Sequence, residues 1–255
     1  MKRTIIYLRS CSSSCTATQH LIKPKIYAHR FSAHIHYTCF MLSHQLTVGL
    51  LHTNCFILTH AATREAWLID PGGNTTEILR ILETENARLT RIILTHAHFD
   101  HILAAPDVQA RTGASLCLHP LEQPVLARAP QAVQAWLGWE WGPAPEPDCF
   151  LHQNDTLTLG DTRIEIRHVP GHSPGSIILV DHGGRQAWVG DVLFRESVGR
   201  TDLPGGNHSQ LIRAINEQIL TLPDDYILYP GHGPATTVGH ERSHNPFITP
   251  ELWVG

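Results

Sequence analysis

The chain has 255 residues, of which 42% are hydrophobic and 16% are charged, as in ordinary globular proteins of one or two domains. No uninterrupted apolar run reaches the ~18 residues that a membrane-spanning helix needs, which argues against a transmembrane protein. The formal net charge is −4 for the whole chain but −10 for residues 41–255. A nucleic-acid-binding surface on residues 41–255 is therefore not expected.

Residues 1–40 contain six basic residues, no acidic residue and no sustained helical or strand periodicity. We expect them to lie outside the folded domain, which would span residues 41–255. Two explanations fit this segment. The one we favour is a reading frame extended upstream of Met41, and the other is a mitochondrial transit peptide, which suits arginines and serines without acidic residues.

Three of the six cysteines also lie in residues 1–40, and Cys55, Cys117 and Cys149 are far apart in the sequence. Because no C-x-x-C pair or regular spacing connects them, the sequence predicts no disulfide framework. A reducing, cytoplasmic compartment fits this pattern best. The sequence predicts no particular oligomeric state.

From Leu46 onward, short apolar runs separated by turn residues predict β-strands, first at 46–50, 55–59 and 66–69. Asn74 and Glu77 resemble a capping box and predict a helix to about Asn86. Residues 91–95 predict a buried strand of the parallel type, because they are apolar without alternation. The later predicted elements are helices at 102–111, 120–137 and 209–220, a loop at 139–147, and strands at 115–118, 156–159, 163–168, 176–181, 186–189 and 226–229. Strands clustered in each half, with helices between and after them, predict two sheets packed face to face with helices outside.

The segment HAHFDH at residues 96–101 follows a predicted strand directly and precedes a predicted helix. Four potential metal ligands in six residues are costly to bury together unless cations share the site. Three further candidates follow other strand ends, in the motifs GHSPG, GD and PGHGP. Five histidines and two aspartates are enough for two metal ions if one aspartate bridges them. The candidates are His96, His98, Asp100, His101, His172, Asp191 and His232.

In this order, these motifs resemble those of the metallo-β-lactamase superfamily over about residues 46–247. The resemblance implies an αββα sandwich, in which two mixed β-sheets carry helices on their outer faces. It also implies two groups of ligands that share Asp191: His96, His98 and His172 on one metal, and Asp100, His101 and His232 on the other. Asp100 and Asp191 are the implied catalytic carboxylates. The implied cofactors are two divalent metal ions, with Zn²⁺ favoured over Fe or Mn.

Three further segments, GDVLFR at 190–195, GRTDLP at 199–204 and ERSHNPF at 241–247, are similar to compact, single-domain glyoxalase II-like hydrolases. The resemblance implies hydrolysis of a small thioester of the S-lactoylglutathione type, because two cations activate water and a thiolate leaves readily. Larger glyoxalase II enzymes hold glutathione with basic residues of a C-terminal helical domain. Only 23 residues follow His232 here, so that mode of glutathione recognition is not expected.

Two alternatives remain open. A persulfide dioxygenase resembles this sequence in its HxHxDH and GRTD-like segments, but uses one iron held by two histidines and one aspartate. A lactamase or a nuclease of the same superfamily is the other alternative. The negative charge of residues 41–255 argues against the nuclease, and the GDVLF and GRTD segments argue against the lactamase.

Other residues carry weaker signals. Asp70, at a predicted strand end, either hydrogen-bonds the metal-binding loop, as the matching aspartate of the superfamily does, or simply forms a turn. Arg200 either contacts an anionic group of the substrate or pairs with Asp202. Three tryptophans around the proline-rich loop either form an apolar wall above the metals or pin the loop to the body: Trp136, Trp139 and Trp141.

Overall fold

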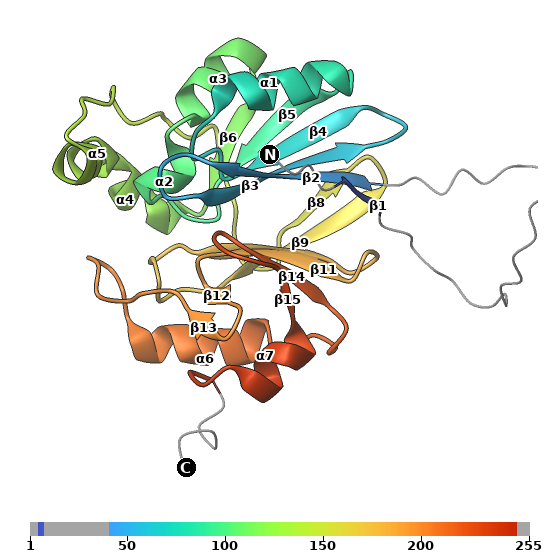
Figure 1. Cartoon of the computed structure of the whole chain (residues 1–255), viewed down its shortest axis with the longest axis vertical. Helices are drawn as coiled ribbons and strands as arrows, with labels where there is room; N and C mark the ends of the chain where they lie inside the picture. Colours follow the sequence, from blue (N-terminus) through green and yellow to red (C-terminus); the bar gives the residue numbers. More distant parts are fainter. Residues whose placement is uncertain (1–4, 8–40, 249–255) are drawn as a thin grey trace, which may run out of the picture.

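The computed structural model of the chain describes residues 5–7 and 41–248 and shows four layers, with two β-sheets between two layers of helices (Figure 1). The first sheet contains, in spatial order, β1 (Ile5–Tyr7), β2 (Met41–Val48), β3 (Thr53–His60), β4 (Glu65–Ile69), β5 (Arg88–Ile93), β6 (Ser115–Leu118) and β7 (Cys149–Phe150). The second contains β15 (Thr236–Thr237), β14 (Ile227–Pro230), β11 (Gln186–Gly190), β10 (Ile177–Asp181), β9 (Thr162–His168) and β8 (Thr156–Leu159). The predicted αββα architecture is confirmed.

Both sheets are mixed. Strands β4 to β7 are parallel to one another, whereas β1 to β4 pair antiparallel. In the second sheet only β11 and β14 are parallel neighbours. The carboxyl ends of parallel strands meet at one edge of a sheet, and the loops that follow them form a crevice there. The fold therefore gathers the loops after β5, β11 and β14 at one end of the sandwich.

The interior between the sheets is filled by large apolar side chains from both of them, including Trp67, Trp188 and Tyr229. Strand β5 has both faces buried, because Ile92 packs towards the outer helices and Ile93 packs between the sheets. This double burial explains why the predicted strand at 91–95 shows no alternation of polar residues. Its pairing with β4 and β6 confirms the parallel type.

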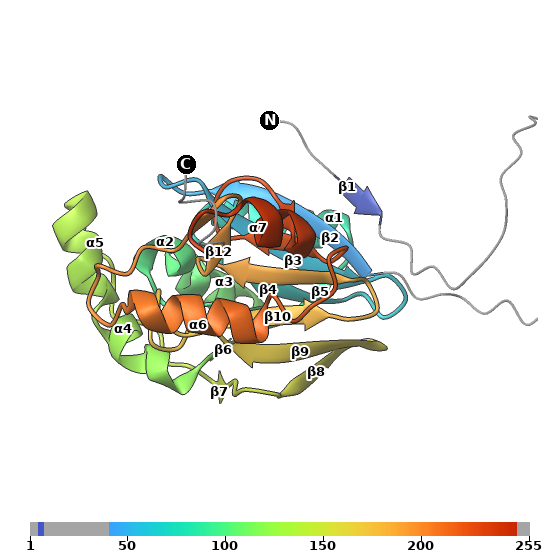
Figure 2. The same cartoon turned by 90° about the horizontal axis from the view of Figure 1, so that it is seen from below.

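Helices cover the outer face of each sheet (Figure 2). On the first sheet lie α1 (Thr75–Thr84) and α3 (Ala105–Thr112), and on the second lie α6 (His208–Gln218) and α7 (Val238–His244). The remaining elements are α2 (Phe99–Ile102), the 3-10 turn η1 (Pro120–Glu122), α4 (Gln123–Ala127), α5 (Ala129–Leu137), and the strand pair β12 (Leu193–Phe194) and β13 (Ser197–Val198). Helices α4 and α5 project at one end of the sandwich, on the left of both views.

Several predicted boundaries are wrong. Strand β2 begins at Met41 rather than near Leu46. The capping box is absent, because Asn74 takes a left-handed backbone conformation, with φ of 59°, and its side chain accepts a hydrogen bond from the Gly49 N–H instead. The helix predicted to begin at Ile102 is α3, which begins at Ala105 with Pro106 in its first turn, and a separate short helix, α2, ends at Ile102.

One disulfide contradicts the prediction from cysteine spacing. Cys117 and Cys149 stand directly opposite each other in the parallel register of β6 and β7, with Cα atoms 4.8 Å apart, and are bonded. The sequence did not reveal this pair, because 31 residues separate them and β7 has only two residues. Cys55 is buried and unbonded. The compartment of the protein stays a prediction.

Of residues 1–40, only Ile5–Tyr7 are described, and they form β1 beside the edge of β2. The rest of the predicted N-terminal extension lies outside the described residues, so the domain boundary at 41 stays a prediction. Within residues 5–7 and 41–248, no helix has both the length and the hydropathy needed to cross a membrane.

Candidate metal centre

All seven predicted ligands meet where the sheets open at one end. The HAHFDH segment leaves β5 and enters α2, and the other three residues lie in the loops that follow β9, β11 and β14. Five of the seven line one cavity of about 390 Å³: His98, Asp100, His172, Asp191 and His232. The other two, His96 and His101, are buried beneath it.

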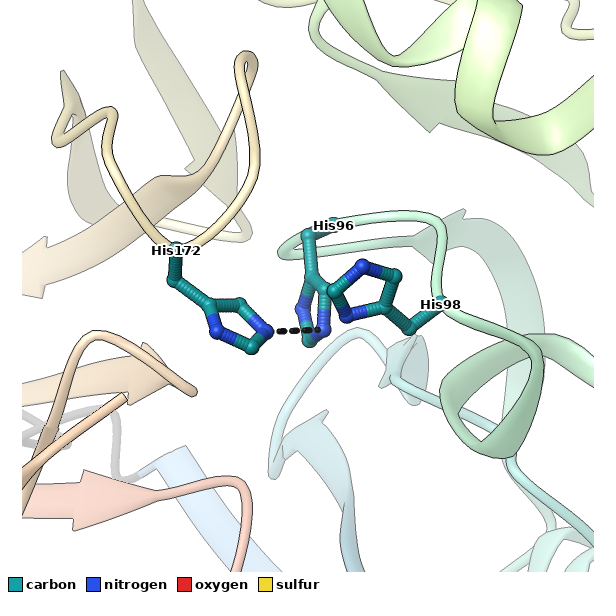
Figure 3. Close-up of side chains that lie close together, drawn as sticks. All are labelled: His96, His98 and His172. Atoms are coloured by element: carbon teal, nitrogen blue, oxygen red, sulfur yellow. Dashed lines mark hydrogen bonds between the residues drawn. The ribbon is translucent and has the colours of Figure 1, made fainter. Parts of the chain in front are cut away.

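Three histidines form the first group of ligand atoms: His96, His98 and His172 (Figure 3). The Nε2 atoms of His96 and His172 lie 3.2 Å apart, and each pair of rings has centroids 4.6–4.7 Å apart. The Nδ1 atom of His172 lies 2.8 Å from the Arg200 carbonyl oxygen. Because a carbonyl oxygen only accepts, Nδ1 carries the proton and Nε2 keeps its lone pair for a metal.

Burial sets the protonation state of this first group. It lowers the pKa of His96 and His172 below the ordinary histidine value, and lowers the pKa of His98 to about 4. Positive charge on neighbouring histidines adds to the effect. The three imidazoles are therefore neutral at pH 7, which is the form that binds a metal.

The second group consists of Asp100, His101 and His232. The Asp100 Oδ2 atom lies 3.1 Å from His232 Nε2 and 3.4 Å from His101 Nε2. Burial alone would lower the pKa of His101, but neighbouring carboxylates, first that of Asp191, raise it well above its usual value. Burial would also lower the pKa of His232, but the hydrogen bond that its Nε2 donates to Asp100 raises it.

Asp191 lies between the two groups. Its carboxylate oxygens are 3.8 Å from His172 Nε2 on one side and 3.4–3.5 Å from the Nε2 atoms of His101 and His232 on the other. A Cβ atom on Gly231 would come within 2.1 Å of Asp191 Oδ1, so the PGHGP turn needs glycine at this position. Asp191 therefore lies in the position that a ligand bridging two metals requires.

Two buried polar atoms in this cluster have no hydrogen-bond partner, His101 Nε2 and Asp191 Oδ1. Buried polar atoms are nearly always paired, so an unpaired nitrogen and oxygen that face each other indicate a missing partner. Imidazole nitrogen and carboxylate oxygen are the donors that Zn²⁺, Fe and Mn accept. The residues therefore fit divalent cations.

Asp70 makes the contact expected of it. One carboxylate oxygen accepts a hydrogen bond from the Thr95 N–H at 2.7 Å, and the other accepts from Thr95 Oγ1 at 2.6 Å. The second oxygen also lies 3.0 Å from His101 Nδ1. Asp70 thus fixes the His101 ring so that its Nε2 faces Asp100 and Asp191.

Glu122 was missed by the sequence analysis. Its buried carboxylate accepts hydrogen bonds from the Ala97 N–H at 2.8 Å, from Ser173 Oγ at 2.5 Å and from the Gly175 N–H at 2.6 Å. Burial raises its pKa despite these three hydrogen bonds. One side chain therefore ties the HAHFDH loop to the GHSPG loop. Its position just after β6, at the same sheet edge, was the available signal.

Asn54 was also missed. Its N–H donates to the Gly231 carbonyl oxygen at 2.6 Å, and its side-chain Nδ2 donates to the carbonyl oxygens of Pro230 at 3.0 Å and Gly233 at 2.8 Å. These bonds hold the turn that carries His232. Nothing in the sequence around Asn54 indicates this role.

Arg200 lines the cavity, but its guanidinium pairs with both carboxylate oxygens of Asp202, at 2.7 and 2.8 Å. Among the tryptophans, only Trp136 lines the cavity. Trp139 and Trp141 border a separate hollow, and Trp141 donates a hydrogen bond to the Leu103 carbonyl oxygen at 3.3 Å. The apolar wall over the cluster therefore includes Trp136 but not the other two.

Comparison with known proteins agrees with this geometry. Residues 48–232 match the model of the metallo-beta-lactamase superfamily. The chain is 34% identical to the hydroxyacylglutathione hydrolase GloC of Haemophilus influenzae over 192 residues, which cover 72% of this chain and 88% of that protein.

Two crystal structures are also similar. BLEG-1 B3 metallo-beta-lactamase has 38% identity and a TM-score of 0.76, covering 81% of this chain and 99% of that one. TTHA1623 in a di-iron-bound form has 36% identity and a TM-score of 0.73, covering 80% and 98%. The family match spans most of the chain and includes all seven clustered residues. This chain therefore belongs to the metallo-β-lactamase superfamily.

Proposed function

We propose that the protein is a dinuclear metal-dependent hydrolase of small thioesters. The observation that carries this proposal is the position of Asp191, whose carboxylate lies within 3.4–3.8 Å of ligand nitrogens in both groups. The first metal would be held by His96, His98 and His172, and the second by Asp100, His101 and His232. Zn²⁺ suits this set of nitrogen and oxygen donors, and the di-iron form of a relative supports iron as the alternative.

When bound, divalent cations supply Lewis acidity, which lowers the pKa of water and stabilises negative charge on a carbonyl oxygen. The chain positions the groups that do this. Asp70 orients His101, the Arg200 carbonyl orients His172, and Glu122 fixes the two loops relative to each other. A thiol leaving group has a pKa near ~8.5, so its departure as a thiolate needs little assistance from a protein acid.

The relatives support different substrates for a hydrolase of this superfamily. The similarity to GloC favours a thioester of the hydroxyacylglutathione type, whereas the similarity to BLEG-1 leaves a β-lactam open. A mononuclear iron dioxygenase acting on persulfides is the alternative from another reaction class. The complete second group, with Asp100 and His232 3.1 Å apart, favours the dinuclear hydrolase.

One preparation tests these alternatives. The protein would be purified without chelator, its Zn, Fe and Mn measured per chain, and S-lactoylglutathione hydrolysis assayed before and after chelation and metal restoration. We expect close to two metals per chain and hydrolysis that follows metal content. One iron per chain with oxygen uptake on glutathione persulfide would instead establish the dioxygenase, and hydrolysis of β-lactams alone would establish the lactamase.

The two metals should bind with different pH dependence. The first group has lowered histidine pKa values, so it is neutral at pH 7 and has few protons to release. His101 has a raised pKa, so a second metal must displace its proton, and the affinity of this step should fall as the pH falls through neutrality. Titration calorimetry in buffers of different ionisation enthalpy measures the protons released. If the first and second equivalents of metal released equal numbers of protons, the assignment of the two ligand groups would be contradicted.

A further inference from the structure

The cavity above the metal centre contains a second arginine, Arg128, which the sequence analysis did not single out. Arg200 is already engaged by Asp202. Arg128 is exposed, and among the described residues no carboxylate pairs with its guanidinium. It is therefore the cationic group of this cavity that is free to bind a ligand.

Arg128 lies at the junction of α4 and α5, which project at the open end of the sandwich. The same two helices line the cavity with the apolar side chains of Val125, Ala129, Ala132 and Trp136. The residue Trp136 is 62% exposed, although it lines a cavity. An exposed aromatic residue and a guanidinium that line one cavity are suited to a ligand that has both an apolar part and an anionic part.

The charges around the cavity point to the same kind of ligand. Asp100 and Asp191 also line it, but they belong to the proposed metal-binding groups, where cations would neutralise them. Residues 41–255 carry a formal charge of −10, so Arg128 and Arg200, which both line this cavity, are not part of a general basic surface. Guanidinium binds carboxylate through two parallel hydrogen bonds, which gives selectivity as well as affinity.

We propose that Arg128 and the apolar face of α4 and α5 select thioesters in which an apolar segment ends in a carboxylate. The carbonyl lies at the buried metal centre, and the carboxylate lies at the mouth against Arg128. This inference rests on the proposed thioesterase function, but it concerns a different part of the substrate from the bond that is cleaved. It also assigns selectivity to Arg128 rather than to Arg200.

Matched substrates test this assignment. In the first pair, the S-acetyl derivative of 3-mercaptopropionate is compared with its methyl ester, and the carboxylate is in the thiol half. In the second pair, a succinyl thioester of 2-mercaptoethanol is compared with its methyl ester, and the carboxylate is in the acyl half. We expect the protein to favour the carboxylate of at least one pair by about 10- to 100-fold in kcat/KM, as for a hydrogen bond to a charged group. The pair that shows the preference identifies the half that points to the mouth.

The decisive variant is Arg128→Gln, which should lower kcat/KM for the carboxylate to about that of its methyl ester and so abolish the preference. Arg163→Gln is the matched control, because Arg163 in β9 is exposed and does not line the cavity, and it should keep the preference. A preference retained in Arg128→Gln, or an equal loss on both members of each pair, would overturn the inference.

Binding separates this inference from the proposed function. The probes are 3-(ethylthio)propionate, a thioether that cannot be hydrolysed, and its methyl ester, titrated into the metal-loaded protein and observed by NMR. Carboxylate binding that requires Arg128 without hydrolysis of any thioester would reject the proposed function and keep this site. Thioester hydrolysis with no dependence on Arg128 would keep the proposed function and reject the site, and the absence of both would reject both.

Discussion

Replacing Asp191 by Asn should lower turnover by more than about 100-fold. Mutating a residue that merely orients a metal ligand already lowers metal affinity or activity by about 10- to 100-fold, and Asp191 is expected to bind the metals directly. The Asp191 carboxylate approaches both ligand groups, with oxygens 3.4–3.8 Å from His101, His172 and His232. The amide keeps the shape of the side chain but removes the charge that offsets repulsion between two cations. We therefore expect the variant to lose metal from the second position first, and metal analysis alongside turnover measures this.

Arg200→Ala is the comparison that makes this result specific. The Arg200 guanidinium pairs with Asp202 at the surface, where solvent and salt screen the interaction. Its contact with His172 uses the backbone carbonyl oxygen, which alanine retains. We expect turnover to fall by less than about tenfold, because exposed pairs of this kind contribute little. Equal losses in the two variants at unchanged metal content would show that the bridging role is misassigned.

The sequence predicted most of this site because its residues come directly after buried strands. Strand β5 has apolar residues on both faces, so it must be central, and the loop after it must lie at the sheet edge where ligands gather. The same reasoning placed His172, Asp191 and His232, each after a strand end. Applied to β6 it would also have found Glu122, whose carboxylate ties two of these loops together.

Other features could not be predicted, because they depend on pairings between distant parts of the chain. Asn54 bonds the backbone of a turn that lies 176 residues further on, and an isolated asparagine does not reveal such a partner. The capping box failed for a similar reason, since Asn74 is turned towards Gly49 by contacts 25 residues away. Local patterns locate elements, whereas such contacts depend on the assembled sheets.

The Cys117–Cys149 disulfide has a consequence for the cavity as well as for stability. Residues 117–149 contain α4 and α5, and hence Arg128 and Trp136, whereas all seven clustered residues lie outside this segment. Strand β7 pairs with β6 over only two residues, so the disulfide is the main covalent constraint on the return of this segment to the sheet. Loss of the disulfide should therefore loosen the apolar wall. Glu122 lies in the same segment, but its hydrogen bonds to Ala97, Ser173 and Gly175 should hold it in place and keep the metal centre intact.

Cys149→Ser should lower the free energy of unfolding by about 3–4 kcal/mol, the chain-entropy estimate for a closed loop of this length. Position 149 is chosen because Cys149 is only partly buried, whereas Cys117 is fully buried in the interior between the sheets. Urea unfolding measures the stability change, metal analysis should show unchanged content, and the preference for carboxylate-bearing thioesters should weaken. The phosphine reductant TCEP is the matched control, because it lacks the metal-binding thiols of dithiothreitol: it should reduce the stability of the unaltered protein to that of Cys149→Ser and have no effect on the variant. If the reductant leaves the stability of the unaltered protein unchanged, the disulfide does not hold this wall. The prediction from cysteine spacing, that the protein has no disulfide framework, would then be correct.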